Sequence, residues 1–590
     1  MRFRQCQTAR RGWRRASPCL ICHVLLAVGL GSALADGTNP PADVGKLTAA
    51  STDLAVTLEW DNPADADFDG VLVLRREGAP VADSPVDGES YTVGQQVSGW
   101  TSEIVCVTTA AASSCTDASV LNDMEYHFES FSYDTSRNYS PGVHVRGLPR
   151  SDPYKWAFTT RAASLAPVGA IPGSYLVSIG DDQLLHRMSE ANGQRGTDWS
   201  PPQVGGAVQS RPMVGDLSPA ADANDLTGFV SSQDGSLYRF GLDQDGTAEA
   251  IADVATDAGC PGGFLQAGPV VMLDLYEQNN NPYDDAVVIA TRCLDVNGDG
   301  TANDNQILLY SHSLGTLFST YDGDADGGGE LDSPGLGISN ATPRIFYRDT
   351  GNNLAYVPVN EDRGDDESLV VLEVRQQSGT PVFDIPAYSE LHGLGDVNTD
   401  PTVFRYGIGN DFRLLFGNDD GTIYLYDALL RTGGASSPLA QRDLYTVSDG
   451  PVKGVAVSTG IPIGGGLFEY WVVWSTDNLV HGIRIQPGTG KFSPSSYWSR
   501  TIPDDASALT GPSEPVVLRW VGGVENTRAF VGASDGVLYE LDATTGTTVR
   551  SWSVEPSATL GAPTFDYNDG VSQGIVIGST SGVVHWVSLD

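Results

Sequence analysis

A short phrase recurs along most of this 590-residue chain and constrains its fold more than any other feature. An apolar run meets a turn of the Asp-Gly type, and a second apolar run ends in Tyr or His; clear copies lie at 230–238, 416–424, 531–539 and 577–585. We expect each copy to be a β-hairpin, because glycine tolerates the positive φ of a primed turn. A second turn often follows and a proline then opens the next unit, so each unit is predicted to have four strands.

The spacing of these units predicts a closed ring. The phrase ends at residues 186, 238, 310, 372, 424, 481, 539 and 585. Eight four-stranded units at this period predict an eight-bladed β-propeller over residues 153–590. The last unit has no room for a fourth strand before Asp590. We expect the segment around Trp156 to supply that strand and close the ring, which removes exposed sheet edges.

The best copy of the phrase resembles a known family. Residues 535–546, followed by Trp552, are similar to the blade repeat of the PQQ-like (quinoprotein-type) propeller superfamily. The resemblance implies the propeller fold; some members are PQQ dehydrogenases, and others carry no cofactor and organise proteins. The dehydrogenases commonly have an adjacent Cys-Cys pair beside the quinone. This chain has none, so PQQ is not expected, and no catalytic residue is predicted.

A smaller all-β unit is predicted before the repeats, at residues 38–150. Val56, Leu58 and Trp60 alternate with polar residues, as in a half-buried strand. The segments at 60–71 and 121–140 resemble the two halves of a bacterial fibronectin type III domain. That resemblance implies a β-sandwich in which Tyr126 takes the tyrosine-corner position, and it implies a spacer or binding module without chemistry. The predicted fold is therefore all-β, a fibronectin type III-like sandwich followed by the propeller.

The first 35 residues are predicted to be a signal peptide. Basic residues precede an apolar run that closes with the small-x-small pattern at Ala33 and Ala35. The CxxCH motif from Cys19 to His23 lies inside this segment and should be removed with it, so haem is not expected. No later stretch reaches 18 consecutive apolar residues, so no transmembrane segment is predicted. We expect an exported protein, located in the periplasm, on the cell surface or outside the cell.

Four cysteines remain after residue 35, namely Cys106, Cys115, Cys260 and Cys293. An exported chain favours disulfides. The simplest pairing joins Cys106 to Cys115 and Cys260 to Cys293, by proximity in sequence; two other connectivities and free thiols stay open.

Two acid-rich loops have the spacing of calcium ligands. Oxygen ligands at positions 1, 3, 5 and 9, with a backbone carbonyl at position 7, can surround a hard cation. The first loop offers Asp295, Asn297, Asp299, Thr301 and Asn303, and the second offers Asp322, Asp324, Asp326, Gly328, Glu330 and Asp332. A solvated acidic turn is the alternative for each. Propeller topology should place both loops, together with the acidic turn 361–367, on one face.

A comparable run, Asp65, Asp67 and Asp69, is not predicted to bind calcium. Val73 stands at its ninth position and has no side-chain ligand. His186, His481 and His585 occupy repeat positions where sister units have Tyr, so we expect packing residues rather than ligands.

The net charge of the chain argues against one class of partner, nucleic acid. The chain has 34 Lys and Arg against 74 Asp and Glu, a formal net charge of −40. Nucleic acid is not expected as a partner, because phosphate binding needs clustered cations. The leading hypothesis is a non-enzymatic interaction protein that binds an envelope or extracellular protein or glycan. The alternatives are a quinoprotein oxidoreductase or glycan-active enzyme, with paired carboxylates or a cofactor in the central funnel, and a pilus-tip-like adhesin. The sequence leaves the oligomeric state open.

Overall fold

The molecule is all-β in the part of the chain that the structure describes. The computed structural model describes residues 39–160, 162–171, 174–216, 226–242, 247–260, 262–263, 265–272, 286–293, 305–311, 315–323, 336–346, 353–360, 367–377, 380–408, 411–429, 439–503, 513–521, 524–568 and 572–589. Within these residues one short helix occurs, α1 (Val254–Asp257), and every other element is a strand.

Most strands form four-stranded antiparallel sheets in which neighbours along the chain pair with one another. This architecture is consistent with a β-propeller. The sheets consist of β9 (Gly169–Ile171), β10 (Tyr175–Ile179) and β11 (Leu185–Ser189); β12 (Met213–Asp216), β13 (Leu226–Ser231), β14 (Ser236–Gly241) and β15 (Ala248–Asp253); β16 (Val270–Met272), β17 (Ala286–Ala290), β18 (Ile307–Ser311) and β19 (Leu317–Tyr321); β20 (Arg344–Phe346), β21 (Asn353–Pro358), β22 (Glu367–Gln377) and β23 (Thr380–His392); β24 (Thr402–Arg405), β25 (Phe412–Gly417), β26 (Thr422–Asp427) and β27 (Gln441–Thr446); β28 (Gly454–Val457), β30 (Leu467–Ser475), β31 (Leu479–Ile485) and β32 (Phe492–Thr501), with β29 (Ile461–Gly464) beside β30; and β33 (Val516–Val521), β34 (Val524–Gly532), β35 (Val537–Asp542) and β36 (Thr548–Ser553).

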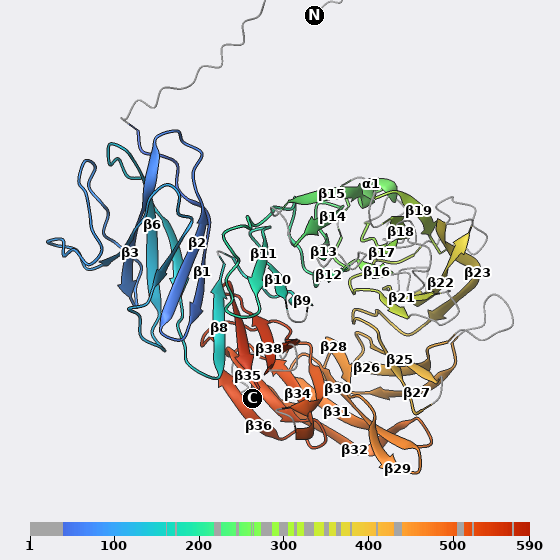
Figure 1. Ribbon diagram of the computed structural model, residues 1–590. Helices are drawn as coiled ribbons and strands as arrows, with labels where there is room; N and C mark the ends of the chain where they lie inside the picture. Colours follow the sequence, from blue (N-terminus) through green and yellow to red (C-terminus); the bar gives the residue numbers. More distant parts are fainter. Residues whose placement is uncertain are drawn as a thin grey trace, which may run out of the picture.

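These sheets follow one another around a ring (Figure 1). The first strands of successive sheets lie beside one another near the centre, as β20 does with β24 and β24 with β28. Neighbouring sheets pack face to face: Val288 and Leu309 of one sheet share a buried cluster with Ala355 and Val370 of the next. The core is therefore divided into apolar layers between sheets, each closed to water.

The ring closes as the sequence predicted. The last sheet contains β37 (Thr564–Asn568), β38 (Ser572–Gly578) and β39 (Val583–Ser588), and its next strand is β8 (Tyr154–Thr159) from the other end of the repeat region. Trp586 of β39 pairs with Trp156 of β8, and both side chains are 1% exposed. The ends of the repeat region are thus joined by a ladder of backbone hydrogen bonds.

The repeated turn differs from the predicted primed type. Gly235, Gly421 and Gly536 have φ values of 88°, 79° and 76°, whereas the aspartates before them do not have positive φ. Only one residue of each turn is left-handed, which fits a type I turn followed by a glycine bulge. The aspartate has another role, because Asp535 Oδ1 accepts from Val537 N–H at 3.0 Å and its Oδ2 accepts from Tyr539 O–H at 2.8 Å.

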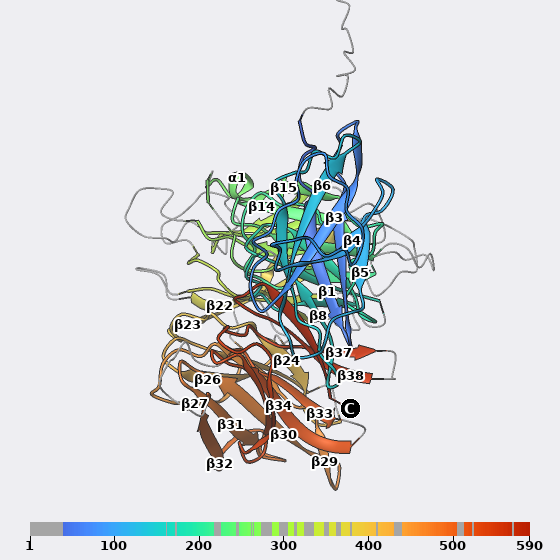
Figure 2. The ribbon, with the colours of Figure 1, turned by 90° about the vertical axis from the view of Figure 1, so that its left-hand side faces the viewer.

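The segment before the ring forms two sheets that share a core. One contains β1 (Gly45–Thr52), β2 (Ala55–Asp61) and β5 (Ser114–Asp117), and the other contains β3 (Phe68–Glu77), β4 (Glu103–Val107), β6 (Tyr126–Asp134) and β7 (Val143–Gly147). Leu58 and Trp60 of the first sheet share a buried cluster with Val73 and Phe128 of the second. This unit stands beside the ring in Figure 1, and it faces the viewer in Figure 2.

The two parts of the molecule share a sheet. β1 pairs with β8, so one continuous sheet runs in the order β37-β38-β39-β8-β1-β2-β5. A polar junction reinforces it: Glu59, 2% exposed, accepts hydrogen bonds from the N–H groups of Arg195 and Gly196 at 2.8 and 3.0 Å. The Arg195 side chain in turn donates to Asp61 Oδ1 at 2.8 Å. Burial raises the pKa of Glu59, whereas the hydrogen bonds from Arg195 and Gly196 act to lower it.

Among the described residues, no helix is long and apolar enough to cross a membrane.

Candidate functional site

One position of the repeat brings polar side chains to the centre of the ring. In six of the sheets it is the residue directly before the proline that precedes the first strand, and it stands two residues before that strand begins. From sheet to sheet this position holds Arg211, Gly268, Thr342, Asp400, Glu514 and Ala562. Because the first strands surround the centre, the side chains of this position converge there although they are far apart in sequence.

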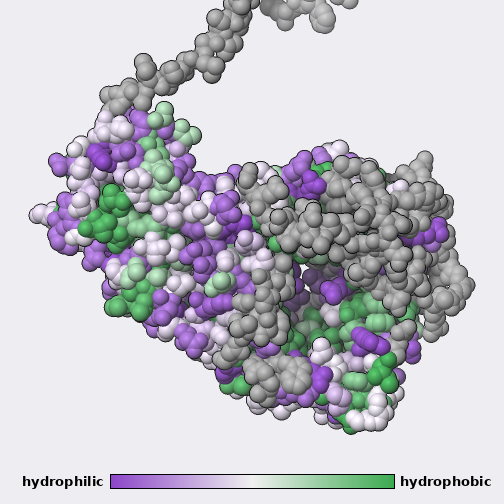
Figure 3. Space-filling view, in the orientation of Figure 1, coloured by the Kyte–Doolittle hydropathy of each residue, from purple (hydrophilic) through white to green (hydrophobic). Residues whose placement is uncertain are grey.

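The convergence forms a cavity of about 250 Å³. Its polar lining comes from Arg211, Thr342, Arg344, Asp400, Thr402 and Glu514. Apolar residues lie between these groups. Many of them are the prolines of the repeat, namely Pro212, Pro269, Pro343, Pro401, Pro515 and Pro563. The molecule is visibly hollowed at the centre of the ring (Figure 3). Two carboxyl groups and two guanidinium groups therefore share one confined, water-accessible space.

Asp400 is oriented by the neighbouring sheet. Its Oδ1 accepts a hydrogen bond from the backbone N–H of Thr342 at 2.7 Å. The Asp400 side chain is exposed to the cavity, which itself lies deep in the protein. This depth raises the pKa of Asp400, while the Thr342 hydrogen bond and the charges of Arg211 and Arg344 act in the opposite direction.

Glu514 depends on a glycine in the adjacent sheet. A β-carbon added at Gly454 would lie 1.8 Å from Glu514 Cγ, so the side chain rests where any other residue at 454 would stand. Depth in the protein, followed by the negative charge of Asp400, raises the pKa of Glu514 to about 8, against the attraction of Arg211. The two carboxyl groups titrate as a coupled pair. With a pKa of about 8, Glu514 is the carboxyl group that we expect to be protonated at neutral pH.

This arrangement offers a hydrogen-bond donor, a carboxylate acceptor and two fixed positive charges. A protonated carboxyl beside an ionised one is the arrangement that general acid–base chemistry uses. It is equally suited to binding a polar ligand with hydroxyl groups and an anionic group, since guanidinium groups recognise anions.

Replacing Glu514 with glutamine should change how stability depends on pH. The folded-state pKa of about 8 lies above the unfolded value, so the folded state binds more protons between pH 5 and 8. The free energy of unfolding of the wild type should therefore fall as pH rises, by up to about 1.4 kcal/mol per pH unit. Glu514→Gln should lose this slope, as measured by urea unfolding at several pH values.

The control is Glu525→Gln on β34, a residue outside the cavity lining. Its unfolding free energy should follow the wild-type pH profile. If the wild type and Glu514→Gln instead gave parallel profiles, Glu514 would not hold the proton.

The predicted calcium loops fall largely outside the described residues. This applies to Asp295, Asn297, Asp299, Thr301 and Asn303, and to Asp324, Asp326, Gly328, Glu330 and Asp332. Asp322 is described and directly follows β19. Calcium coordination by these residues therefore stays a prediction.

The described residues at the ends of these loops lie together. Asn305, which follows the first loop, donates its backbone N–H to the carbonyl of Leu336, which follows the second, at 3.1 Å. The Asn305 side-chain amide donates to the same carbonyl at 3.2 Å. Its Oδ1 accepts from the N–H of Cys293, which stands immediately before the first loop. Both loops therefore start or end at one hydrogen-bonded junction between neighbouring sheets.

The disulfides and histidines follow the simplest sequence interpretation. Cys106 is joined to Cys115, and Cys260 to Cys293. The second disulfide fixes the chain directly before the first predicted calcium loop. His186, His481 and His585 are at most 2% exposed. Each lies beside an acidic side chain, as His481 Nε2 does with Asp449 Oδ2 at 3.0 Å.

Sequence reasoning missed the cavity residues. It noted the prolines that open each unit but not the residue before them, where Arg211, Asp400 and Glu514 stand. A signal was present: this position is otherwise small or uncharged, so three charged residues in it depart from the repeat. Gly454, which makes room for Glu514, could not be recognised without the structure.

Comparison with known proteins shows distant structural similarity only. No protein-family model matches the sequence. No curated protein matches it either. Among solved structures, quinohemoprotein alcohol dehydrogenase from Comamonas testosteroni has 12% identity and a TM-score of 0.45 over 72% of this chain and 75% of that one.

Two further structures are similar at the same level. BamB from Moraxella catarrhalis has 13% identity and a TM-score of 0.42 over 73% of this chain and 97% of that one. The computationally designed protein Ika8 has 16% identity and a TM-score of 0.41, with the same coverage. These distant matches to β-propellers, the PQQ type among them, concern the fold, and no substrate or partner follows from them.

Proposed function

We propose that this chain is an exported, non-enzymatic interaction protein whose propeller binds an envelope or extracellular protein or glycan at one calcium-organised face. The observation that carries the proposal is the junction of Asn305 with Leu336 and Cys293. It gathers the ends of two acid-rich loops between neighbouring sheets, where a cation would offset their repulsion. A face assembled in this way is a docking surface that needs no reacting group.

We further infer eight blades of the PQQ-like type and a fibronectin type III-like sandwich. Support for the blade number comes from β8, which completes the last sheet, and from the adjacency of β37 to β9. Support for the sandwich comes from Tyr126, whose hydroxyl accepts from Leu121 N–H at 3.0 Å, five residues upstream, as in a tyrosine corner. The absence of an adjacent Cys-Cys pair argues against PQQ.

Calcium titration of the purified protein tests the proposed face. After dialysis against a chelator and its removal, calorimetry should show calcium binding that disappears in the variant Asp299→Ala/Asp326→Ala. The matched control is Asp67→Ala, in the acid-rich run that lacks a ninth ligand. It should bind calcium as the wild type does. A wild type that gives no heat of binding would remove calcium from the proposal.

Partner binding is tested separately by affinity capture from envelope fractions. The bait is the full chain, with and without a chelator, and the control bait is Asp299→Ala/Asp326→Ala. The proposal expects one protein or glycan retained by the wild type in calcium and lost in both other conditions. If the partner were retained equally with and without calcium, the docking surface would lie outside the predicted calcium loops.

The cavity favours one alternative, a glycan-active enzyme. Asp400 and Glu514 line one cavity, and the pKa of Glu514 is raised to about 8. Glycoside hydrolysis uses one protonated and one ionised carboxyl group in this way. Purified protein should then release reducing ends from envelope polysaccharide, and Asp400→Asn and Glu514→Gln should each abolish the release. Wild-type protein without such release leaves the cavity as a binding site.

A further inference from the structure

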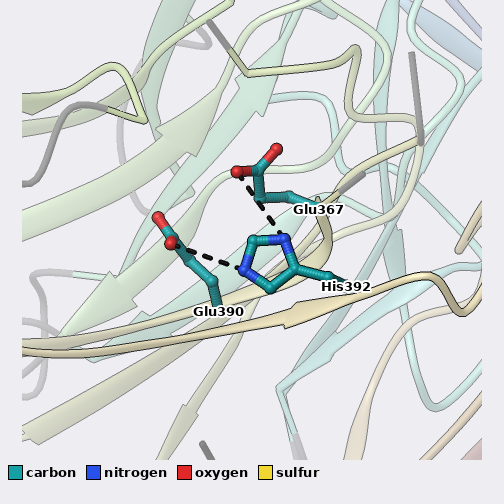
Figure 4. A group of neighbouring side chains, drawn as sticks. All are labelled: Glu367, Glu390 and His392. Atoms are coloured by element: carbon teal, nitrogen blue, oxygen red, sulfur yellow. Dashed lines mark ion pairs between the residues drawn. The ribbon is translucent and has the colours of Figure 1, made fainter. Parts of the chain in front are cut away.

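A group of potential metal ligands lies at one end of the sheet β20–β23. Glu367 is the first residue of β22, and Glu390 and His392 end β23. One ligand atom from each of the three lies within 4.8 Å of the others. Figure 4 shows the imidazole between the two carboxylates, with Nδ1 towards Glu367 and Nε2 towards Glu390. Both nitrogen–oxygen distances are 3.8 Å, which is too long for a hydrogen bond.

A β-bulge turns Glu367 towards the other two residues. Glu367 pairs with His392, whereas Leu369 pairs with Leu391, so Ser368 is an extra residue in β22. In a regular ladder, Glu367 would share a face with Leu369 and Leu391, because side chains alternate. The bulge reverses this and puts Glu367 on the face of Glu390 and His392. Bulges commonly redirect a side chain in this way beside functional sites.

Glu367 has a buried oxygen without a partner. The residue is 8% exposed, and its Oε2 is buried and makes no hydrogen bond with any described residue. Leaving a charged oxygen buried and unsatisfied is costly, so such an oxygen usually has a partner such as a cation or an ordered water molecule. The other oxygen of this carboxylate faces His392 at ion-pair distance. The orphaned oxygen is an observation independent of the clustering of the three side chains.

Glu390 is held in place by the neighbouring sheet. Its Oε1 accepts a hydrogen bond from the hydroxyl of Tyr321, the last residue of β19. An oxygen of Glu390 and an oxygen of Glu367 lie within 4.8 Å of each other, so a bound cation would offset the repulsion between the two carboxylates. Tyr321 is the kind of outer partner that fixes a metal-binding carboxylate.

We propose that Glu367, Glu390 and His392 bind a divalent first-row transition metal ion, Zn²⁺ in the first place. An imidazole nitrogen with carboxylate oxygens is a zinc ligand set, and calcium takes oxygen ligands instead. Three protein ligands leave a coordination position for water, and the His392 side chain, 42% exposed, keeps the site open to solvent. The centre is distinct from the predicted calcium loops and does not depend on them.

The experiment is zinc titration of the metal-free full chain in the presence of calcium, followed by calorimetry and by competition with a chromophoric chelator. One zinc ion should bind per chain. Glu367→Gln and His392→Gln should each weaken zinc affinity at least about 10–100-fold, since losing a direct ligand costs no less than losing its outer partner. X-ray absorption of the zinc-loaded protein should show one imidazole and otherwise oxygen ligands.

Matched controls separate this centre from the rest of the molecule. Glu373→Gln, on the same strand β22 and 9% exposed, and His144→Gln, in the first unit, should keep wild-type zinc affinity. Asp299→Ala/Asp326→Ala should also keep it, whether or not calcium binding is lost. Absence of zinc binding to the wild type, or equal affinity in His392→Gln, would overturn the proposal and leave His392 as an ion-pair partner of the two glutamates.

Discussion

Trp156→Ala is expected to lower the free energy of unfolding by about 3–5 kcal/mol, the usual cost of deleting a buried tryptophan. Trp156 is 1% exposed, packs in a cluster with Phe158 and Trp586, and donates its indole N–H to the carbonyl of Glu190 at 3.0 Å. Its removal leaves both a cavity and an unsatisfied carbonyl at the strand that closes the ring. Chemical unfolding followed by circular dichroism measures the loss.

Hydrogen exchange should show the effect of Trp156→Ala at the closing strands themselves. The amides of β8 and β39 should lose protection in Trp156→Ala, because their ladder is the closure. The control is Trp100→Ala in the first unit, where the indole is partly exposed and stacks on Tyr91 at 5.3 Å. That variant should be less destabilised and should keep β39 protected. A Trp156→Ala protein with a loss below about 1 kcal/mol would show that the closure contributes little.

Removing the disulfide between Cys260 and Cys293 should have the second large effect. The two cysteines are 33 residues apart, and a cross-link of that span stabilises a fold by about 4 kcal/mol in the chain-entropy model. The double variant Cys260→Ala/Cys293→Ala should lose about that much in urea unfolding. Calcium affinity should fall as well, because Cys293 donates its N–H to Asn305 at the junction of the predicted loops.

The other disulfide supplies the control. Cys106 and Cys115 are 9 residues apart, so Cys106→Ala/Cys115→Ala should lose about 3 kcal/mol. It lies in the first unit, and its loss should leave calcium affinity unchanged. Equal effects of both double variants on calcium binding would mean that the Cys260–Cys293 bond does not organise the loop face.

Most of the fold could be predicted from the repeat, because the repeat combines two local signals. Apolar runs of strand length and a glycine turn recur at intervals of 46 to 72 residues, and those features depend on the residues beside them in sequence. The closing role of Trp156 was also predictable, since the last unit lacked a strand. The turn type was predicted wrongly, because an Asp-Gly pair suits both a primed turn and a type I turn with a glycine bulge. The hydrogen bond that Asp535 accepts from the N–H of Val537 favours the type I turn with a glycine bulge.

The candidate sites were harder to predict because they depend on contacts between units. Asp400 and Glu514 belong to different sheets, and only the closed ring brings them to one cavity. Glu367 was grouped with the acidic turn 361–367, but its place opposite His392 depends on a single bulged residue. A shift of one residue moves the side chains of a strand to the opposite face of the sheet, and no pattern of residue types in this chain predicts that shift.

The position of β8 between β1 and β39 governs the order in which the molecule can be assembled. The chain is synthesised from its N-terminus, so β1 and β8 can pair early, while β39 begins at Val583. Until then β8 is an edge strand, and edge strands recruit other chains. The first unit covers one side of β8 and presents the other to the last three strands. Completion of the ring therefore waits for β39, and a chain that stopped before Val583 would leave one side of β8 as an unpaired sheet edge.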